Sequence, residues 1–333
     1  MASSATRPGR DVTRDDVARL AGVSSAVVSY VVNNGPRPVA EATRLRVQGA
    51  IEKLGYRPNA AARSLTTGRP QLLGLIVPDL QNPYFSALAE AVEAAAKEQG
   101  LGLVLAQAQS ADLPELVESL SGRLVAGIIT ATLPTPEVTQ ALLRNRVPMV
   151  KLSLALPLDA MRSIWPDYYG GTRAAVDHLI AVHGHREVAL ITGSELRDER
   201  ERAWHDSLRE AGLGTGHLIR TAWSAHGGFA AAATLLADHD AATAVFVTSD
   251  QQAIGVIAGL YRAGRIVPDD IAITSFDGSL DAEFTIPPLT TVDVPLAEMA
   301  ADAIAEILGV HTVGRAYPAQ LVVRRSCGCN SAV

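Results

Sequence analysis

From Leu72 onward the chain alternates short, continuous apolar runs with longer segments whose apolar residues recur at helical spacing, such as 83–99 and 199–212. The apolar runs are LLGLIVP, LGLVLAQ, VAGIIT, VPMVKL, EVALITG, AVFVTSD and DIAITSF. Continuous Val, Ile and Leu runs are typical of parallel strands that helices cover on both faces. The pattern therefore predicts a doubly wound α/β architecture, with enough strands for two parallel sheets and so for two lobes with a cleft between them.

The chain of 333 residues is too long for one ordinary compact domain. No apolar run approaches the roughly 20 residues of a membrane span, and the first residues lack the apolar stretch of a secretory signal. We therefore expect a cytoplasmic protein with no membrane partner. The cysteines, Cys327 and Cys329, are one residue apart near the end, which excludes a disulfide framework and predicts a frayed tail.

Charge is unevenly distributed along the chain. Residues 1–70 contain 11 Lys and Arg against 5 Asp and Glu, whereas the remaining residues contain 18 against 30. A small basic head on a larger acidic body is typical of a nucleic-acid-binding module joined to one that binds something else. A disordered basic tail would carry the same charge, so charge alone leaves both interpretations open.

The basic head is predicted to contain three helices. Thr13 can cap the first helix, which ends near Gly22, and Ser24 can cap a second helix over 25–32. The third helix spans 41–54 and offers four apolar residues to a small core, namely Leu45, Val47, Ile51 and Leu54. The short link between the first two helices indicates a helix-turn-helix, whose second helix can enter the major groove of DNA. Any other three-helix bundle is the alternative.

The segments DVARLAGVSSAVVSYVVN and RPVAEATRLRVQGAIEKLGYRPNAAARSL resemble the DNA-binding head of the LacI/GalR family of transcription regulators. The resemblance implies base contacts from Ser25, Ala26 and Tyr30. Tyr30 stands where the family usually has Arg, and one hydroxyl with a ring face cannot read guanine as a bidentate Arg does. Further DNA-binding candidates in the head are Thr13, Ser24, Ser29 and Asn33.

The segment that follows the head, from Asn59 to Leu65, is predicted to form about two turns of helix, a length that is marginal without partner contacts. By the resemblance it is a hinge helix that pairs with its dimer mate in the minor groove. Asn59, Ala62 and Leu65 are then its DNA contacts, and Leu65 is an apolar wedge that kinks the duplex. A plain linker is the alternative. Because pairing requires two copies, we expect a homodimer or tetramer on a near-palindromic operator in double-stranded DNA.

The resemblance extends through essentially the whole chain and implies a periplasmic-binding-protein-like body whose lobes are crossed by three strands. The predicted domains are 11–57 for the helix-turn-helix, 58–70 for the hinge helix and linker, and 71–333 for effector binding and dimerisation. Within the body, the first lobe is placed at about 71–164 and 294–317, and the second at about 165–293 and 318–333.

Polar and aromatic residues follow several predicted strands, where open α/β sheets bind their ligands. They are Asp79, Asn82, Tyr84 and Phe85 after the first run, Ser249 and Asp250 after AVFVT, and Asp277 after DIAITSF. Rings beside carboxylate and guanidinium groups suit a sugar, whose hydroxyls take hydrogen bonds and whose C–H face stacks on an aromatic. The same set would also suit a nucleobase.

The resemblance assigns the effector contacts more narrowly. ERERAWHDSLREAG is similar to the family's R-x-x-G-F-x-x-A-L segment, which places the effector-contacting arginine on Arg200. The other matched positions are Tyr84 and Phe85 in N-P-Y-F, Ser153 where an acidic residue is common, Trp223 at a stacking aromatic, Ser249 at a polar contact, and Asp277 in G-F-D. Structural roles are the alternatives: caps for Asp250 and Asp277, a solvated charge for Arg200, and core packing for Trp223 and Phe85.

No motif in the sequence predicts catalysis. There is no Walker A sequence and no G-x-S-x-G elbow, and the glycines of residues 212–216 follow a helix rather than a strand. His183-Gly184-His185 lies in a turn and has no third ligand at a recognisable spacing. We therefore predict no catalytic residue, no metal and no cofactor.

Together these features predict a sequence-specific DNA-binding transcription regulator, a repressor, that is controlled by a small molecule in the cleft between its lobes. The resemblance makes a sugar the expected effector. The alternative is a sugar-binding or sugar-processing α/β protein whose head does not read DNA.

Overall fold

The computed structural model describes residues 12–33, 37–56, 70–121, 125–144, 147–152, 162–193, 199–239, 241–310 and 316–330. Of the predicted site residues, Asn59, Ala62, Leu65 and Ser153 lie outside these ranges. The chain divides into two compact units, Met1–Pro70 and Gln71–Val333.

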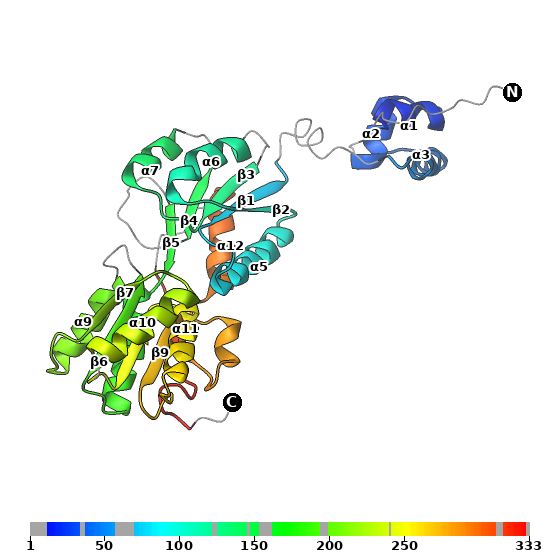
Figure 1. Ribbon diagram of the computed structural model, residues 1–333. Helices are drawn as coiled ribbons and strands as arrows, with labels where there is room; N and C mark the ends of the chain where they lie inside the picture. The colour runs from blue at the N-terminus through cyan, green and yellow to red at the C-terminus, as the bar shows by residue number, and fades with distance from the viewer. Residues whose placement is uncertain are drawn as a thin grey trace. The chain divides into compact units, whose positions relative to one another are not determined.

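The first unit contains the three predicted helices, α1 (Arg14–Ala21), α2 (Ser25–Asn33) and α3 (Glu41–Leu54) (Figure 1). The predicted caps of the first two helices are confirmed. The Thr13 hydroxyl accepts a hydrogen bond from the Asp16 N–H at 3.4 Å, and the Asp16 carboxylate accepts one from the Thr13 N–H at 3.0 Å. The Ser24 hydroxyl accepts from the Val27 N–H at 3.4 Å. These bonds satisfy amide groups that the first turn of a helix otherwise leaves unpaired.

A small apolar core joins the three helices, and Val17, Val28 and Val47 are fully buried in it. The prediction that Leu45 closes this core is wrong, because its side chain is 59% exposed. The residues of α3 that face the core are Val47, Ala50, Ile51 and Leu54, which recur at the spacing of one helix face. Leu45 precedes Val47 by two positions, which places it about 200° around the helix from Val47.

The second unit contains two six-stranded sheets. The first has the order β11-β5-β4-β3-β1-β2, with every described pair parallel. Its strands are β1 (Leu72–Val77), β2 (Gly102–Gln107), β3 (Val125–Thr130), β4 (Met149–Leu152), β5 (Arg162–Pro166) and β11 (Ala316–Tyr317). One face is covered by α5 (Pro83–Glu98) and α12 (Leu296–Ile307), and the other by α6 (Leu113–Ser121), which η1 (Ser110–Asp112) precedes, and α7 (Pro136–Leu143).

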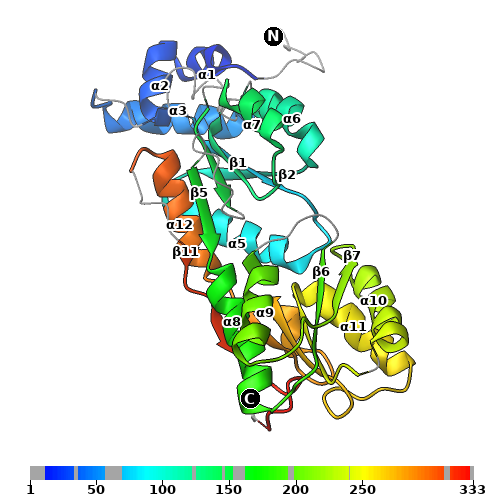
Figure 2. The same ribbon diagram turned by 90° about the vertical axis from the view of Figure 1, so that its left-hand side faces the viewer.

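The second sheet has the order β12-β10-β9-β8-β6-β7, and β12 is its antiparallel strand. Its strands are β6 (Val188–Gly193), β7 (Leu218–Thr221), β8 (Ala244–Val247), β9 (Ala272–Asp277), β10 (Thr290–Asp293) and β12 (Gln320–Val322). One face is covered by α8 (Tyr168–Asp177), its π-helical continuation η2 (His178–Val182) and α9 (Glu199–Glu210). The other is covered by α10 (Ala225–Asp238) and α11 (Asp250–Arg262), which lie side by side (Figures 1 and 2), and η3 (Leu280–Glu283) follows β9.

The prediction of two doubly wound sheets is confirmed, with the antiparallel edge strand β12 as a departure from the all-parallel expectation. The chain passes between the two sheets three times, after β5, after β10 and after β11. Helices on both faces bury the strands, so each lobe is a three-layer unit. No helix among the described residues is long and apolar enough to cross a membrane.

The prediction of a frayed carboxyl-terminal tail is wrong for residues 324–330. The Ser326 hydroxyl accepts a hydrogen bond from the Thr290 N–H at 2.8 Å and donates one to the Ile273 carbonyl at 2.7 Å. Cys327 is 1% exposed. The segment is ordered because it makes hydrogen bonds to backbone groups at the amino-terminal ends of β9 and β10, which would otherwise lack partners there.

Candidate functional site

A cavity of about 500 Å³ lies between the two lobes of the body. When the six strands of each sheet are numbered along the chain, both sheets have the order 2-1-3-4-5-6. The order therefore reverses between β1 and β3 in one lobe and between β6 and β8 in the other. Ligands of doubly wound sheets bind at the carboxyl ends of strands beside such a reversal. The lining residues are Pro78, Asp79, Asn82, Tyr84, Phe85, Gln107, Gln109, Ser110, Ala131, Thr132, Leu133, Leu152, Tyr168, Arg200, Trp223, Ser249, Phe276, Asp277 and Val294.

The start of α5 forms the first-lobe wall. The Asn82 side chain caps this helix by accepting a hydrogen bond from the Tyr84 N–H at 3.0 Å, and Pro83 fits the first helical position. The cap places Tyr84 and Phe85 at the cavity, with their ring centroids 5.2 Å apart and nearly perpendicular. Burial, together with Tyr168 and Asp277, raises the pKa of Tyr84 well above its usual value, so its hydroxyl remains a hydrogen-bond donor.

Arg200 on α9 lies at the centre of the second-lobe wall. Its guanidinium donates to the Thr248 carbonyl at 2.9 Å and stacks between Tyr168 and Trp223, 4.8 Å and 4.9 Å from their ring centroids. Its side chain is buried, so the alternative of a solvated charge is wrong. Two aromatic faces and a carbonyl hold the guanidinium in one orientation.

Trp223, on the loop between β7 and α10, is 39% exposed, so the core-packing alternative is wrong for this residue. Its indole packs directly on Gly193, where an added Cβ would lie 2.0 Å from the ring atoms. The loop is anchored by Gln252, whose amide donates to the Ala222 carbonyl at 3.1 Å. Ser249 is buried at the cap of α11 and accepts a hydrogen bond from the Gln252 N–H at 3.2 Å.

The two carboxyl groups near the end of β9 have different environments. Asp250 is fully buried and accepts hydrogen bonds from the Ser275 hydroxyl at 2.5 Å, the Thr291 hydroxyl at 2.6 Å and the Ser279 N–H at 2.7 Å. It does not line the cavity, which favours its structural alternative. Burial raises the pKa of Asp250 and these hydrogen bonds oppose the rise.

Asp277 lines the cavity and accepts a hydrogen bond from the Asp250 N–H at 3.3 Å. Burial and the neighbouring Asp250 raise its pKa well above the usual value, and Arg200 opposes the rise. Its φ of 131° is strained for a residue with a side chain. Strained backbone of this kind clusters at binding sites, where the surrounding structure maintains it.

Several lining residues were not predicted from the sequence. Gln107, Gln109 and Thr132 lie at or just after two strands that were predicted, so the rule of strand carboxyl ends could have found them. The Gln109 amide donates to the Pro78 carbonyl at 2.8 Å, which holds two of the first-lobe loops together. Tyr168 follows β5, a strand that the sequence pattern did not reveal.

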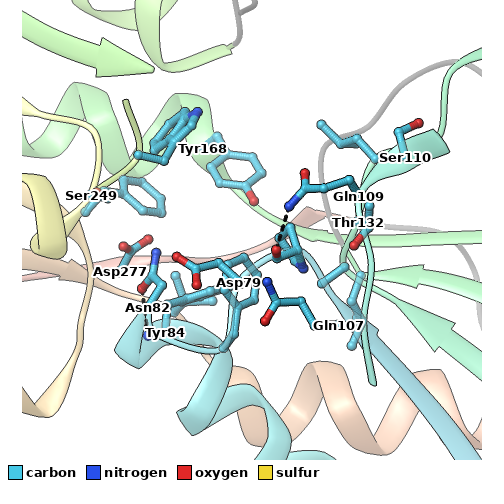
Figure 3. Close-up of a pocket in the computed structure, with 18 of the residues that line it drawn as sticks. Asp79, Asn82, Tyr84, Gln107, Gln109, Ser110, Thr132, Tyr168, Ser249 and Asp277 are labelled. Carbon is cyan, nitrogen blue, oxygen red and sulfur yellow. Dashed lines mark hydrogen bonds between the residues drawn. The ribbon is translucent and has the colours of Figure 1, made fainter. Parts of the chain in front are cut away.

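The cavity thus combines aromatic faces with fixed polar groups from both lobes. Figure 3 shows Ser249, Asp277 and Tyr84 on one side, Gln109, Ser110 and Thr132 on the other, and Asp79 between them. Carboxylate, guanidinium and amide groups can bind several hydroxyls at once, and the rings offer stacking surfaces. The six predicted effector residues that the structure describes all line this one cavity, and Ser153 lies outside the described residues.

The predicted DNA-binding residues of the head lie in or beside the first two helices. Ser24 and Ala26 are exposed at the start of α2, and Ser29 and Tyr30 are half-buried on the same helix. The Ser25 hydroxyl donates to the Asp15 carboxylate of α1. Two further candidates are Thr13, which caps α1, and Asn33, which ends α2.

Comparison with known proteins gives consistent results for both units. Residues 13–59 match the family described as bacterial regulatory proteins, lacI family, and residues 176–327 match a periplasmic binding protein-like domain. The chain is 35% identical over 309 residues to the ribose operon repressor of Escherichia coli (strain K12), covering 88% of this chain and 92% of that protein.

Two solved structures resemble the whole chain. The lac repressor dimer bound to operator and the anti-inducer ONPF has a TM-score of 0.85 at 28% identity, covering 96% of this chain and 99% of that one. The transcriptional regulator CelR in complex with cellobiose has a TM-score of 0.70 at 30% identity, covering 95% and 99% of the two chains.

Proposed function

Because the chain belongs to the lacI family of bacterial regulatory proteins, we propose that it is a sequence-specific DNA-binding repressor whose affinity for its operator is controlled by a sugar. The observation that carries the proposal is the cavity between the lobes, where Arg200 and Asp277 lie among aromatic rings in a chain that also contains a helix-turn-helix. The protein acts in the cytoplasm, where its operator is, and it binds its ligand without turning it over. It functions as a homodimer, as the lac repressor does in its operator complex.

In the proposed mechanism, the effector binds residues of both lobes and so favours one arrangement of the lobes over another. Tyr84 and Phe85 come from the first lobe, and Arg200, Trp223 and Asp277 come from the second. A ligand that contacts both walls binds the two arrangements unequally, which is the condition for shifting their populations. The shift changes the hinge segment around Leu65, which we propose inserts into the minor groove of the operator.

The DNA-binding part is tested by incubating the full-length protein with a random duplex library at near-physiological salt, which weakens non-specific phosphate contacts. We expect enrichment of a near-palindrome. A second selection uses Tyr30→Ala, which should change the preferred bases in each half-site. The matched control is Tyr261→Ala, because Tyr261 is 83% exposed on the body and should leave the preferred site unchanged.

Failure to enrich any site, both without ligand and with each candidate ligand added, would contradict the repressor assignment. It would favour the alternative of a sugar-binding or sugar-processing protein whose head does not read DNA. An unchanged site in Tyr30→Ala would contradict only the assignment of Tyr30 to base contacts.

The effector part is tested by screening a panel of pentoses, hexoses, disaccharides and purine bases for a change in operator affinity. Arg200→Ala and Asp277→Ala should each abolish the response to the active compound while leaving operator affinity in its absence nearly unchanged. The matched control is Arg202→Ala on the same helix, since Arg202 is solvent-exposed and stacks on Tyr169 instead. An intact response in folded Arg200→Ala and Asp277→Ala would show that the effector binds elsewhere.

A further inference from the structure

Four potential metal ligands meet in the second lobe, outside the cavity described above: His178, His183, Cys327 and Cys329. The Nε2 atoms of His178 and His183 are 3.2 Å apart. The Cys329 sulfur lies 3.6 Å from the first of these nitrogens and 3.3 Å from the second. All four donor atoms lie within 4.8 Å of one another.

The three separations among His178, His183 and Cys329 match edges of a tetrahedron around one zinc ion. Zn–N distances of about 2.05 Å and Zn–S distances of about 2.3 Å give edges of about 3.4 Å between nitrogens and about 3.6 Å between nitrogen and sulfur. The three separations above differ from these edges by no more than about 0.3 Å. Two imidazoles and two thiols are also one of the ligand sets that structural zinc sites use.

The π-helical geometry of η2 brings the two histidines together. In an α-helix, side chains five positions apart point about 140° away from each other. Over η2 the helix has π-helical geometry, which is wider than that of an α-helix. The wider turn brings His178 and His183 to the same side, with their ring centroids 4.9 Å apart. Widened turns of this kind are frequent at functional sites.

The carboxyl-terminal segment is held so that both cysteines face these rings. Gly328 has a φ of 104°, which reverses the chain between the two cysteines, and an added Cβ there would lie 3.2 Å from the His183 ring. The Cys327 sulfur accepts a hydrogen bond from the Thr290 hydroxyl at 3.2 Å, which a thiolate ligand would keep, and donates one to the Arg324 carbonyl at 3.4 Å, which loss of the proton to a metal would release. The Ser326 hydrogen bonds to β9 and β10 fix the position of the whole turn.

We propose that His178, His183, Cys327 and Cys329 form a structural zinc site. Four protein ligands complete the tetrahedron and leave no position for a substrate, which is the arrangement of structural rather than catalytic zinc. The ion joins the end of α8, which follows the first crossing between the lobes, to the segment after β12, which follows the third crossing. Zinc thereby fixes two of the three crossing segments to each other inside the second lobe. This site is independent of the proposed effector.

The test is the zinc content of the full-length protein, purified under reducing conditions without a chelator or a polyhistidine tag. Inductively coupled plasma mass spectrometry should find about one zinc ion per chain. Cys329→Ser and His183→Gln should each hold less than about one fifth of that amount after desalting. The matched control is His185→Gln, because His185 lies two residues from His183 but bonds to the Thr243 hydroxyl and is not one of the four ligands.

A second measurement does not depend on how well the ligand variants fold. Wild-type protein stripped of metal and loaded with Co²⁺ should show the absorption of tetrahedral, thiolate-bound cobalt, and one equivalent of Zn²⁺ should displace it. Adding Zn²⁺ to the stripped protein should raise its midpoint of thermal unfolding by several degrees, and the His185→Gln protein should respond equally.

Three outcomes would overturn the proposal. They are wild-type protein that retains no zinc after incubation with one equivalent, equal zinc in wild type and Cys329→Ser, and a disulfide between Cys327 and Cys329 in protein kept under reducing conditions.

Discussion

Lys151, one of three lysines in the chain, is buried in β4 and should destabilise the folded protein at neutral pH. Its side chain is 1% exposed, and its ammonium group has no hydrogen-bond partner among the described residues. Burial lowers the pKa of Lys151 from 10.5 to about 8. At about 1.36 kcal/mol per unit, this shift corresponds to about 3 kcal/mol. Replacement by the apolar Met should recover about this amount at pH 7.

The sign of the pH dependence follows from the direction of this shift. Below pH 8 the lysine is charged in both states, so the full penalty is present. Between pH 8 and 10.5 the unfolded chain binds more protons than the folded one, so stability rises with pH. The advantage of Lys151→Met should therefore fall from about 3 kcal/mol at pH 7 to about 1 kcal/mol at pH 10.

The assay is thermal unfolding of wild type and Lys151→Met between pH 7 and 10. Taking about 2 °C per kcal/mol for a protein of this size, the variant should unfold about 6 °C higher at pH 7 and about 2 °C higher at pH 10. The control is Lys97→Met, because Lys97 is exposed near the end of α5 and should change the midpoint little at either pH. A lower midpoint for Lys151→Met at pH 7, or a gain that does not change with pH, would refute the reasoning.

Three further substitutions test the local arguments. Ala40→Ser should stabilise the head by about 0.5 to 2 kcal/mol, measured by unfolding of its helices, because Ala40 begins α3 with no side-chain cap. Gly193→Ala should displace the Trp223 indole that packs on it and weaken the effector response, measured as the shift in operator affinity, without lowering operator affinity itself. Asp250→Ala should destabilise the body by about 3 kcal/mol or more in urea unfolding, since it leaves several buried hydrogen-bond donors without their acceptor.

The sequence predicts the central strands and the helices that cover them because these elements have strong local patterns. Strands β1, β3 and β6 are six-residue apolar runs that can only be buried between helices. Strands β5 and β7 have at most five residues and mix polar with apolar ones, so neighbouring strands rather than local preference make them extended. The prediction that Leu45 packs in the core of the head was wrong for a related reason. An apolar residue of a helix reaches the core only when it lies on the face of the helix that packs against the core.

The sequence predicted those residues of the candidate site that directly follow the carboxyl end of a recognisable strand. Asp277 follows a strand whose carboxyl end must lie at the opening of the sheet, so its place in the cavity follows from topology. The partner contacts that distinguish Asp250 from Asp277 were not predictable, since they join residues 25 to 41 positions apart. The proposed metal ligands were not predictable from the sequence, because His183 and Cys329 meet across 146 positions. His185, two positions after His183, bonds to the Thr243 hydroxyl instead.

The arrangement of the cavity limits how an effector can act on DNA binding. Because its walls come from two lobes joined by three crossings, a ligand that touches only one wall has equal affinity for every lobe arrangement and shifts none of them. A ligand that bridges Tyr84 and Arg200 has different affinities for different arrangements of the lobes. The free-energy difference between these affinities is the upper limit of its effect on DNA binding by the head. By thermodynamic linkage, operator DNA must then change ligand affinity by the same factor, about 1.4 kcal/mol for each tenfold change. Under the proposed function, residues on both walls are therefore required for regulation, even where contacts on one wall would suffice for binding.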